Sequence, residues 1–199
     1  MQFDGFRLFR EAIDAEGQKR LAAEVMAAVV AAPFYRPITP AGKAMSVEQT
    51  NLGAAGWVTD ARGYRYEPRH PLTGAPWPAM PQSLLDLWAR YADADRPPDC
   101  CLVNLYRGTA RMGLHRDADE ADLTAPVLSI SLGDTAVFRL GGPGRSDPTR
   151  SFRLFSGDVC LLAGASRGAF HGVDRVLGGG SRVTPGGGRL NLTLRRALA

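Results

Sequence analysis

The sequence predicts an α+β fold, in which a double-stranded β-helix, or jelly roll, follows N-terminal helices. From residue 99 onward, short apolar runs recur at regular spacing, which is typical of a two-sheet β fold. Before residue 95, two segments carry apolar residues at helical spacing instead. The 23 glycines and 14 prolines further favour turns and short strands over a helical bundle.

The 199 residues are enough for one domain with a sizeable core. Neither an internal repeat nor a linker of biased composition divides the chain. We therefore expect a single domain over residues 1–199. Helices and a lid are expected in about residues 1–95, and the jelly-roll core in about residues 96–199.

Two helices are predicted in the N-terminal half. The first covers residues 12–32, with Asp14 as a capping residue and Pro33 at its end. Its apolar face is expected to consist of Ile13, Leu21, Val25, Met26, Val29 and Val30. The second helix covers residues 83–94, with Ser83 as its N-cap.

Short strands and loops are predicted between and after the helices. Residues 45–53 and 56–68 have the composition of strands joined by glycine turns. Residues 70–81 form a proline-rich loop, which cannot lie inside a helix or a central strand. A second loop, rich in glycine and expected to be mobile, lies between Val173 and Gly188.

The C-terminal half is read as a series of core strands. Residues 99–106 form an apolar strand, and residues 189–198 alternate in polarity like a half-buried strand. Residues 125–133 and 135–142 flank a Gly-Asp pair, which predicts a hairpin. Residues 151–164 repeat this pattern.

The chain carries a mild positive charge of +4, and nearly all of its basic residues are arginines, because Lys19 and Lys43 are the only lysines. Arginine suits bidentate contact with phosphate or carboxylate. A basic excess fits a nucleic-acid partner. A general arginine-rich composition explains the same charge equally well.

The three cysteines, Cys100, Cys101 and Cys160, form no CxxC spacing, which argues against a disulfide framework or a zinc ribbon. We therefore expect a reducing compartment and a cytoplasmic location. No apolar stretch reaches the length of a membrane span, and Asp4 and Glu11 interrupt any signal-peptide core.

An HRD motif places two residues of metal-ligating type two positions apart. On a strand or its extended exit, His115 and Asp117 project to one side and can chelate one ion. His171 is the candidate third ligand, because His70 lies in the proline-rich loop. Two histidines and one carboxylate leave Fe(II) open positions for a co-substrate and O₂. A zinc hydrolase uses the same ligand types, and unrelated polar residues would show the same pattern.

The last predicted strand carries Arg189, Asn191 and Arg195 at even spacing, so all three side chains project to one face. Cations inside a barrel need an anion, and a dicarboxylate supplies one that arginine binds bidentately. Asn104 and Tyr106 alternate in the same way on the first core strand and can bind the same ligand. The alternative is a solvated polar face.

Five motifs give the chain a specific resemblance to a known family. They are NLY at residues 104–106, HRDADE at 115–120, LSISLG at 128–133, FHGV at 170–173 and RLNLTLR at 189–195. The segments MSVEQTNLGAAGWVTDARGYRY and PWPAMPQSL agree as well. In order and spacing, about residues 33–196 resemble the AlkB family of Fe(II)- and 2-oxoglutarate-dependent dioxygenases, close to its bacterial DNA-repair branch.

The resemblance implies that Fe(II) is bound by three catalytic residues, His115, Asp117 and His171. The 2-oxoglutarate site is expected to consist of Asn104, Tyr106, Arg189, Asn191 and Arg195. Arg195 is expected to hold the distal carboxylate, and Arg189 the carboxylate nearer the metal. The implied reaction is the oxidative demethylation of bases such as 1-methyladenine and 3-methylcytosine in DNA repair, which yields formaldehyde, succinate and CO₂.

The same resemblance implies a nucleotide-recognition lid with the substrate-binding residues Trp57 and Tyr64, and with Tyr66 nearby. A flipped base would rest between the indole ring and the first metal-binding histidine. Methylated adenine and cytosine are cations, so an aromatic face and Asp119 would attract them. Arg145 is expected to contact a phosphate or a base edge, although it and Asp119 also fit ordinary solvated loops.

Two positions depart from the family pattern. Gln49 stands where close relatives carry Met, and Lys43 stands where they carry an aromatic residue. Both belong to the lid, so they leave the preferred base and strand open, and Lys43 is expected to compensate through a phosphate contact. Trp77 and Trp88 are interpreted as packing residues.

The expected partner of a monomeric chain is methylated single- or double-stranded DNA, with RNA left open. A 2-oxoglutarate-dependent hydroxylase of a peptide or small molecule would share the iron and Arg195 but would not need Trp57 or Tyr64. Steep salt dependence of binding would favour nucleic acid over that alternative. In a non-catalytic nucleic-acid-binding jelly roll, the HRD and FHG motifs would be structural.

Overall fold

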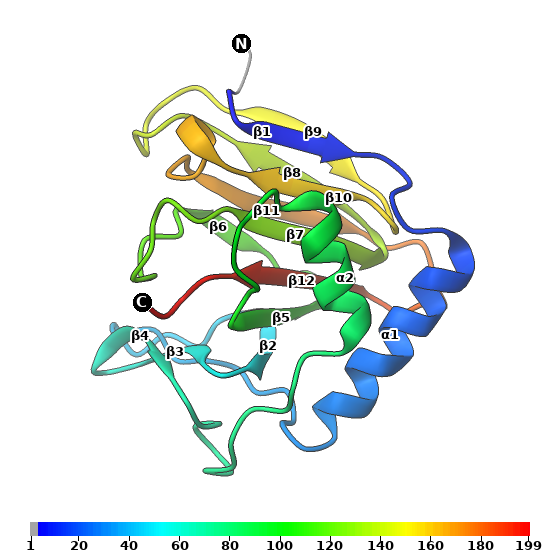
Figure 1. Cartoon of the computed structure of the whole chain (residues 1–199), viewed down its shortest axis with the longest axis vertical. Helices are drawn as coiled ribbons and strands as arrows, with labels where there is room; N and C mark the ends of the chain where they lie inside the picture. Colours follow the sequence, from blue (N-terminus) through cyan, green and yellow to red (C-terminus); the bar gives the residue numbers. More distant parts are fainter. Residues whose placement is uncertain (1–3) are drawn as a thin grey trace.

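Two antiparallel β-sheets form the core of the computed structural model, which describes residues 4–199 (Figure 1). The larger sheet consists, in spatial order, of β1 (Phe6–Phe9), β10 (Val159–Leu162), β7 (Val127–Gly133), β12 (Arg189–Arg195), β5 (Cys100–Tyr106) and β2 (Glu48–Gly53). The smaller sheet consists of β6 (Met112–His115), β11 (His171–Leu177), β8 (Thr135–Leu140) and β9 (Arg150–Leu154). This arrangement is the predicted jelly roll.

Two helices cover the larger sheet, α1 (Ala15–Val29) and α2 (Gln82–Tyr91). Their buried side chains share one apolar cluster with Leu190, Leu192 and Leu194 of β12. β12 was expected to be half-buried, but every residue of it is buried. The reason is that helices cover its apolar face while the second sheet encloses its polar face.

The predicted helix ends are partly wrong. Asp14 caps α1 as expected, because its Oδ1 accepts a 2.7 Å hydrogen bond from Gly17 N. However, α1 ends at Val29 rather than at Pro33, and Val30 is 84% exposed. Ser83 does not cap α2; its hydroxyl donates to the carboxylate of Glu24 on α1 instead.

The predicted hairpin between residues 125–133 and 135–142 is also wrong. β7 pairs with β10 and β12, whereas β8 pairs with β11 and β9, so the chain crosses from one sheet to the other. Gly133 allows this crossing with a φ of +93°, a conformation that favours glycine. β9 and β10 are separated in the same way.

The N-terminal half contributes more to the core than was expected. β1 was not predicted, and both β1 and β2 belong to the larger sheet. The lid expected near residues 56–68 is the hairpin of β3 (Gly56–Asp60) and β4 (Gly63–Glu67). The glycine-rich loop is shorter than expected, because residues 173–177 belong to β11.

The remaining segments agree with the sequence. Residues 70–81 form neither helix nor strand. Trp77 and Trp88 are buried, as expected for packing residues, and all three cysteines are buried and unpaired. Within residues 4–199, no helix combines the length and apolar character that crossing a membrane requires.

Candidate active site

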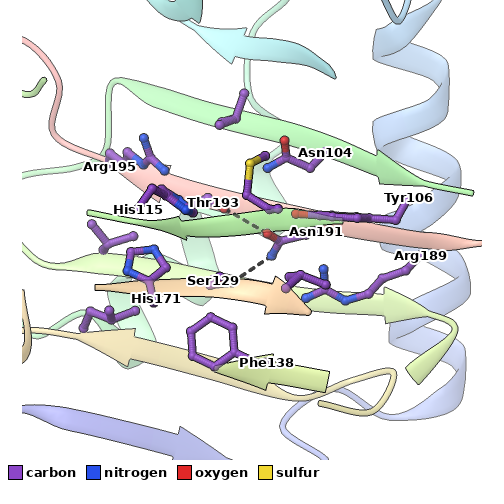
Figure 2. A pocket seen from close by; sticks show the side chains of 16 residues that line it. Asn104, Tyr106, His115, Ser129, Phe138, His171, Arg189, Asn191, Thr193 and Arg195 are labelled. Atoms are coloured by element: carbon purple, nitrogen blue, oxygen red, sulfur yellow. Dashed lines mark hydrogen bonds between the residues drawn. The ribbon is translucent and has the colours of Figure 1, made fainter. Parts of the chain in front are cut away.

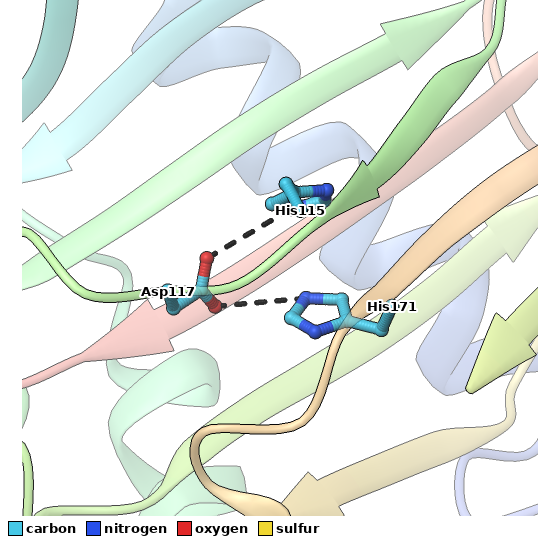
Figure 3. Close-up of side chains that lie close together, drawn as sticks. All are labelled: His115, Asp117 and His171. Atoms are coloured by element: carbon cyan, nitrogen blue, oxygen red, sulfur yellow. Dashed lines mark ion pairs between the residues drawn. The ribbon is translucent and has the colours of Figure 1, made fainter. Parts of the chain in front are cut away.

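His115, Asp117 and His171 come together at one end of the smaller sheet (Figure 3). His115 is the last residue of β6 and His171 the first of β11, and the two are paired in register. Asp117 lies on the extended exit from β6. One potential ligand atom from each residue falls within 4.8 Å of the other two. The structure therefore assembles the three predicted metal ligands.

Backbone carbonyls orient both imidazoles. His115 Nδ1 lies 2.9 Å from Gly113 O, and His171 Nδ1 lies 3.0 Å from Ala169 O. When these nitrogens donate, each Nε2 carries the free lone pair, and a carboxylate oxygen of Asp117 lies 3.8 Å from each Nε2. Burial and the neighbouring His115 lower the pKa of His171 to about 4, so this ring is neutral and able to bind a metal at neutral pH.

Asp117 supplies the negative charge of the cluster. Burial raises the pKa of its carboxyl group, but Arg195, His171 and His115 outweigh burial and hold the pKa well below its usual range. Its Oδ2 is buried and accepts no hydrogen bond within the described chain. An ionised carboxylate with an unsatisfied oxygen beside two imidazole nitrogens fits a divalent metal ion such as Fe(II).

An inner cavity extends from this cluster between the two sheets (Figure 2). Alternate residues of β5 and β12 form its polar lining: Asn104, Tyr106, Arg189, Asn191, Thr193 and Arg195. All of them are buried, which excludes the alternative of a solvated face. The structure therefore brings the five predicted co-substrate residues to one cavity.

Arg189 lies at the end of the cavity away from the two histidines (Figure 2). Its guanidinium packs 5.3 Å from the Tyr106 ring centroid, and its Nη2 donates to Ser131 Oγ at 2.9 Å. Its Nε and Nη1 are buried without a partner, and no carboxylate within residues 4–199 pairs with it. A buried cation with two unused donors fits an anionic ligand.

Arg195 occupies the opposite end, beside the metal cluster. Its Nη2 lies 3.1 Å from Asp117 Oδ1, and its Nη1 lies 3.2 Å from Glu120 Oε1. The expected order of the two arginines relative to the metal ligands is therefore wrong. Arg195 is the arginine near the metal ligands. The backbone of Arg189 lies six residues earlier on the same strand, about 20 Å from that of Arg195.

A second cavity, the outer cleft, opens from the metal cluster and has a volume of about 350 Å³. It shares four lining residues with the inner cavity, Leu102, Met112, His115 and Arg195. The lid hairpin contributes Trp57 and Tyr64, whose rings stack with centroids 5.5 Å apart. Aromatic side chains and a predicted metal ligand thus line the same cleft.

Two further predicted residues line the outer cleft. Trp57 Nε1 donates to Asp119 Oδ2 at 2.8 Å, so this carboxylate belongs to the cleft rather than to a detached loop. Arg145 donates to Leu114 O at 2.9 Å and lies 5.8 Å from the ring centroid of Phe170. Lys43 is exposed and does not line the cleft.

Tyr66 also does not line the cleft; its side chain belongs to a buried ion network. Its hydroxyl donates to Glu120 Oε1 at 2.7 Å and accepts from Arg195 Nη1 at 3.1 Å. Arg167 completes the network, with Nη2 3.2 Å from Glu120 Oε2 and Nη1 donating to Asp117 O. Glu120 and Arg167 were not predicted as site residues. Nothing in the local sequence around an acid in HRDADE or an arginine in a loop indicates that its side chain is buried.

A jelly roll with a His-Asp-His cluster and a buried cationic cavity defines a non-haem iron, 2-oxoglutarate-dependent oxygenase. The model of the 2OG-Fe(II) oxygenase superfamily matches residues 5–195. Within that superfamily the chain belongs to the AlkB family. It is therefore an enzyme, a dioxygenase that uses Fe(II) and 2-oxoglutarate.

Two relatives support this assignment. The chain is 62% identical to the alpha-ketoglutarate-dependent dioxygenase AlkB homolog of Caulobacter vibrioides, over 97% of this chain and 88% of that protein. It is 46% identical to AlkB of Escherichia coli, over 83% of this chain and 78% of that protein. The solved structure of OsALKBH1 matches with a TM-score of 0.77 at 30% identity, over 96% of each chain, which confirms the predicted fold.

More distant relatives carry names that state an activity. ALKBH1C of Arabidopsis thaliana, a DNA N(6)-methyladenine demethylase, is 41% identical over 50% of this chain and 24% of that protein. The tRNA demethylase abh1 of Schizosaccharomyces pombe is 28% identical over 68% of this chain and 46% of that protein.

Proposed function

We propose that this dioxygenase removes N-methyl groups from nucleic-acid bases, with 1-methyladenine and 3-methylcytosine as substrates, and thereby repairs alkylated DNA. The observation that carries the proposal is the outer cleft, which is lined by Trp57, Tyr64 and Asp119 together with the predicted metal ligand His115. The demethylase names of relatives that act on DNA and on tRNA support it.

The cleft has the chemistry that a flipped methylated base requires. Such a base needs a surface to stack on once it has left the helix, and Trp57 and Tyr64 offer aromatic faces. N1-methyladenine and N3-methylcytosine are cations, which aromatic faces and the Asp119 carboxylate both attract. Arg145, which also lines the cleft, would contact an adjacent phosphate or a base edge.

We assign the inner cavity to 2-oxoglutarate. Arg189, with its two unused donors, would bind the distal carboxylate, and Tyr106 would assist it. Asn104 and Asn191 line the middle of the cavity, and Arg195 lies where the other end of the co-substrate meets the metal ligands. His115, Asp117 and His171 would hold Fe(II).

When bound, Fe(II) with 2-oxoglutarate and O₂ supplies the oxidising power to place a hydroxyl group on the methyl carbon, as the co-substrate becomes succinate and CO₂. The hydroxymethyl group then leaves as formaldehyde, and the base recovers its neutral ring. The protein would hold the two reactants in two cavities that share His115 and Arg195 as lining residues. The buried lining of the inner cavity would keep water from the co-substrate.

The test is product analysis on oligonucleotides that contain 1-methyladenine or 3-methylcytosine, as single- and double-stranded DNA and as RNA. We expect methyl loss by mass spectrometry with an equal amount of formaldehyde, dependent on both Fe(II) and 2-oxoglutarate. If 2-oxoglutarate is consumed while every methylated oligonucleotide remains intact, the enzyme oxidises another class of substrate.

We further propose a monomer that works in the cytoplasm on methylated DNA, single- or double-stranded, with RNA as an additional substrate. Three buried, unpaired thiols agree with a reducing compartment. Light scattering of the purified chain tests the oligomeric state, and the oligonucleotide panel ranks the substrates.

A further inference from the structure

A pair of side-chain amides joins the two cavities. Gln49 on β2 is paired in register with Asn104 on β5, and its Nε2 donates to Asn104 Oδ1 at 2.7 Å. Both side chains are buried, at 1% and 4% exposure. Gln49 lines the outer cleft and Asn104 lines the inner cavity, so this hydrogen bond crosses the wall between them.

Each amide retains one atom for another partner. Gln49 Oε1 is buried and has no hydrogen-bond partner within residues 4–199. Asn104 directs its nitrogen into the inner cavity and turns its oxygen away from it (Figure 2). Because an amide nitrogen donates and an amide oxygen accepts, Asn104 offers a donor to the inner cavity, and Gln49 keeps a free acceptor in a side chain that lines the outer cleft.

The co-substrate fixes the direction of this pair. A carboxylate only accepts hydrogen bonds, so 2-oxoglutarate in the inner cavity selects the Asn104 orientation that presents Nδ2. Asn104 Oδ1 then faces Gln49, which must present Nε2 to it, since two opposed amide oxygens would repel each other. Gln49 Oε1 is thereby left without a partner within residues 4–199, as the free acceptor of a side chain that lines the outer cleft.

We propose that Gln49 is a positioning residue for the co-substrate and a specificity-determining residue for the base. Its Nε2 holds Asn104 in the orientation that binds the carboxylate. Its Oε1 favours bases with an exocyclic amino group beside the methylated nitrogen over bases with a carbonyl group there, which would leave two buried acceptors facing each other. The base-selecting half rests on the proposed demethylation; the co-substrate half does not.

The co-substrate half is tested by binding rather than by turnover. Gln49→Met keeps the side chain's size but removes both polar atoms. We expect it to raise the Kd of 2-oxoglutarate about tenfold in anaerobic calorimetry of the Fe(II)-loaded protein. In an Asn104→Leu background, Gln49→Met should add no further loss, because it acts through Asn104.

The matched control is Thr50→Val on the same strand, where the buried hydroxyl donates to Ala32 O at 2.7 Å and contacts neither cavity. It should lower stability but leave the Kd of 2-oxoglutarate unchanged. An unchanged Kd in Gln49→Met, or an equal loss in the Asn104→Leu background, would overturn the positioning role.

The base-selecting half is tested by the ratio of kcat/KM for 3-methylcytosine to that for 3-methyluracil, which carries a carbonyl in place of the amino group. Gln49→Met should lower this ratio about tenfold, and Thr50→Val should not change it. An unchanged ratio overturns base selection. Absence of demethylation in the wild-type chain overturns the proposed function and base selection together, while calorimetry alone decides the co-substrate half.

Discussion

Two arginines on one face of β12 differ mainly in what surrounds them. Within residues 4–199, Arg189 is buried without a carboxylate partner, whereas Arg195 lies within 3.2 Å of both Asp117 and Glu120. A buried unpaired charge destabilises the fold until a ligand neutralises it, while a buried paired charge destabilises the fold only when it is removed. The two residues should therefore respond to the same substitution in opposite ways.

Arg189→Met is expected to preserve or raise the Tm of the ligand-free protein, because it removes an unpaired buried cation. The same change should abolish the rise in Tm that 2-oxoglutarate produces and raise its Kd by about two orders of magnitude. Differential scanning calorimetry with and without 2-oxoglutarate measures both effects. Arg107→Met, an exposed arginine near the same end of β5, is the control, and an intact ligand response in Arg189→Met would contradict the assignment.

Arg195→Met is expected to destabilise the ligand-free protein by roughly 3 kcal/mol, because it leaves two buried carboxylates without their shared cation. Urea unfolding at pH 7 measures this loss. Adding Glu120→Gln should restore part of the stability, since Arg167 then remains as one buried cation for one buried carboxylate instead of two. If Arg195→Met is as stable as the wild-type chain, the ion network contributes nothing to the fold.

Several site residues could be predicted singly, but their order could not. Even spacing on RLNLTLR shows that Arg189 and Arg195 share a face, and this pattern is unchanged when the strand is reversed relative to the metal. Only the pairing of β12 with β5 and β7 decides which arginine meets Asp117. Glu120 and Arg167 depend on contacts across 47 positions of sequence, which local patterns cannot reveal.

Among the elements, the lid hairpin β3–β4 has two anchors near the metal cluster. On the cleft side, Trp57 donates to Asp119. On the buried side, the Tyr66 hydroxyl binds Glu120 and Arg195, and burial holds the pKa of Tyr66 well above its usual range, so it stays a protonated donor. The hairpin is thus tied to the residues that surround Asp117.

Tyr66→Phe is expected to loosen the hairpin, because it removes the buried anchor without changing the aromatic ring. Amide exchange across residues 56–67 should accelerate, and the KM for a methylated oligonucleotide should rise about fivefold. Thr59→Val is the matched control, since its buried hydroxyl on the same hairpin bonds to nothing within residues 4–199. Equal exchange rates in Tyr66→Phe and the wild-type chain would show that this anchor does not hold the lid.

Element positions were predicted better than element pairings. Alternation and glycine turns located β3, β4, β5 and β12 because each has the polarity pattern of a strand. The Gly-Asp pair after β7 indicated a hairpin because it has the residues of a tight turn. The actual partners of β7 come from sequence-distant strands, and no turn residue encodes that choice.

For the whole molecule, the cysteines report on the integrity of the core. Cys100, Cys101 and Cys160 are at most 1% exposed, and burial raises the pKa of Cys100 and Cys160 to about 12. The thiolate is the reactive form, and a raised pKa leaves almost none of it at pH 8. We expect iodoacetamide at pH 8 to leave the native protein unmodified and to label all three residues in urea, as measured by mass spectrometry. Rapid labelling of the native chain would contradict this packing.

The overall fold class followed from the sequence because turn residues and strand periodicity repeat throughout the C-terminal half. The completion of the larger sheet by β1 and β2 did not, because these short strands pair with partners far along the chain, at Val159–Leu162 and Cys100–Tyr106. Pairing between strands that are far apart in the chain depends on the topology of the fold, and the local composition of each strand does not predict it.

The central position of β12 also affects the order in which the larger sheet can form during synthesis of the chain. β12 is the last of the described strands in chain order, yet it lies between β7 and β5, which emerge from the ribosome earlier. Until it inserts, these two strands have open edges and cannot close the sheet. The strand that completes the hydrophobic core also delivers Arg189, Asn191 and Arg195. We therefore expect closure of the larger sheet and assembly of the co-substrate site to occur together, once β12 has inserted.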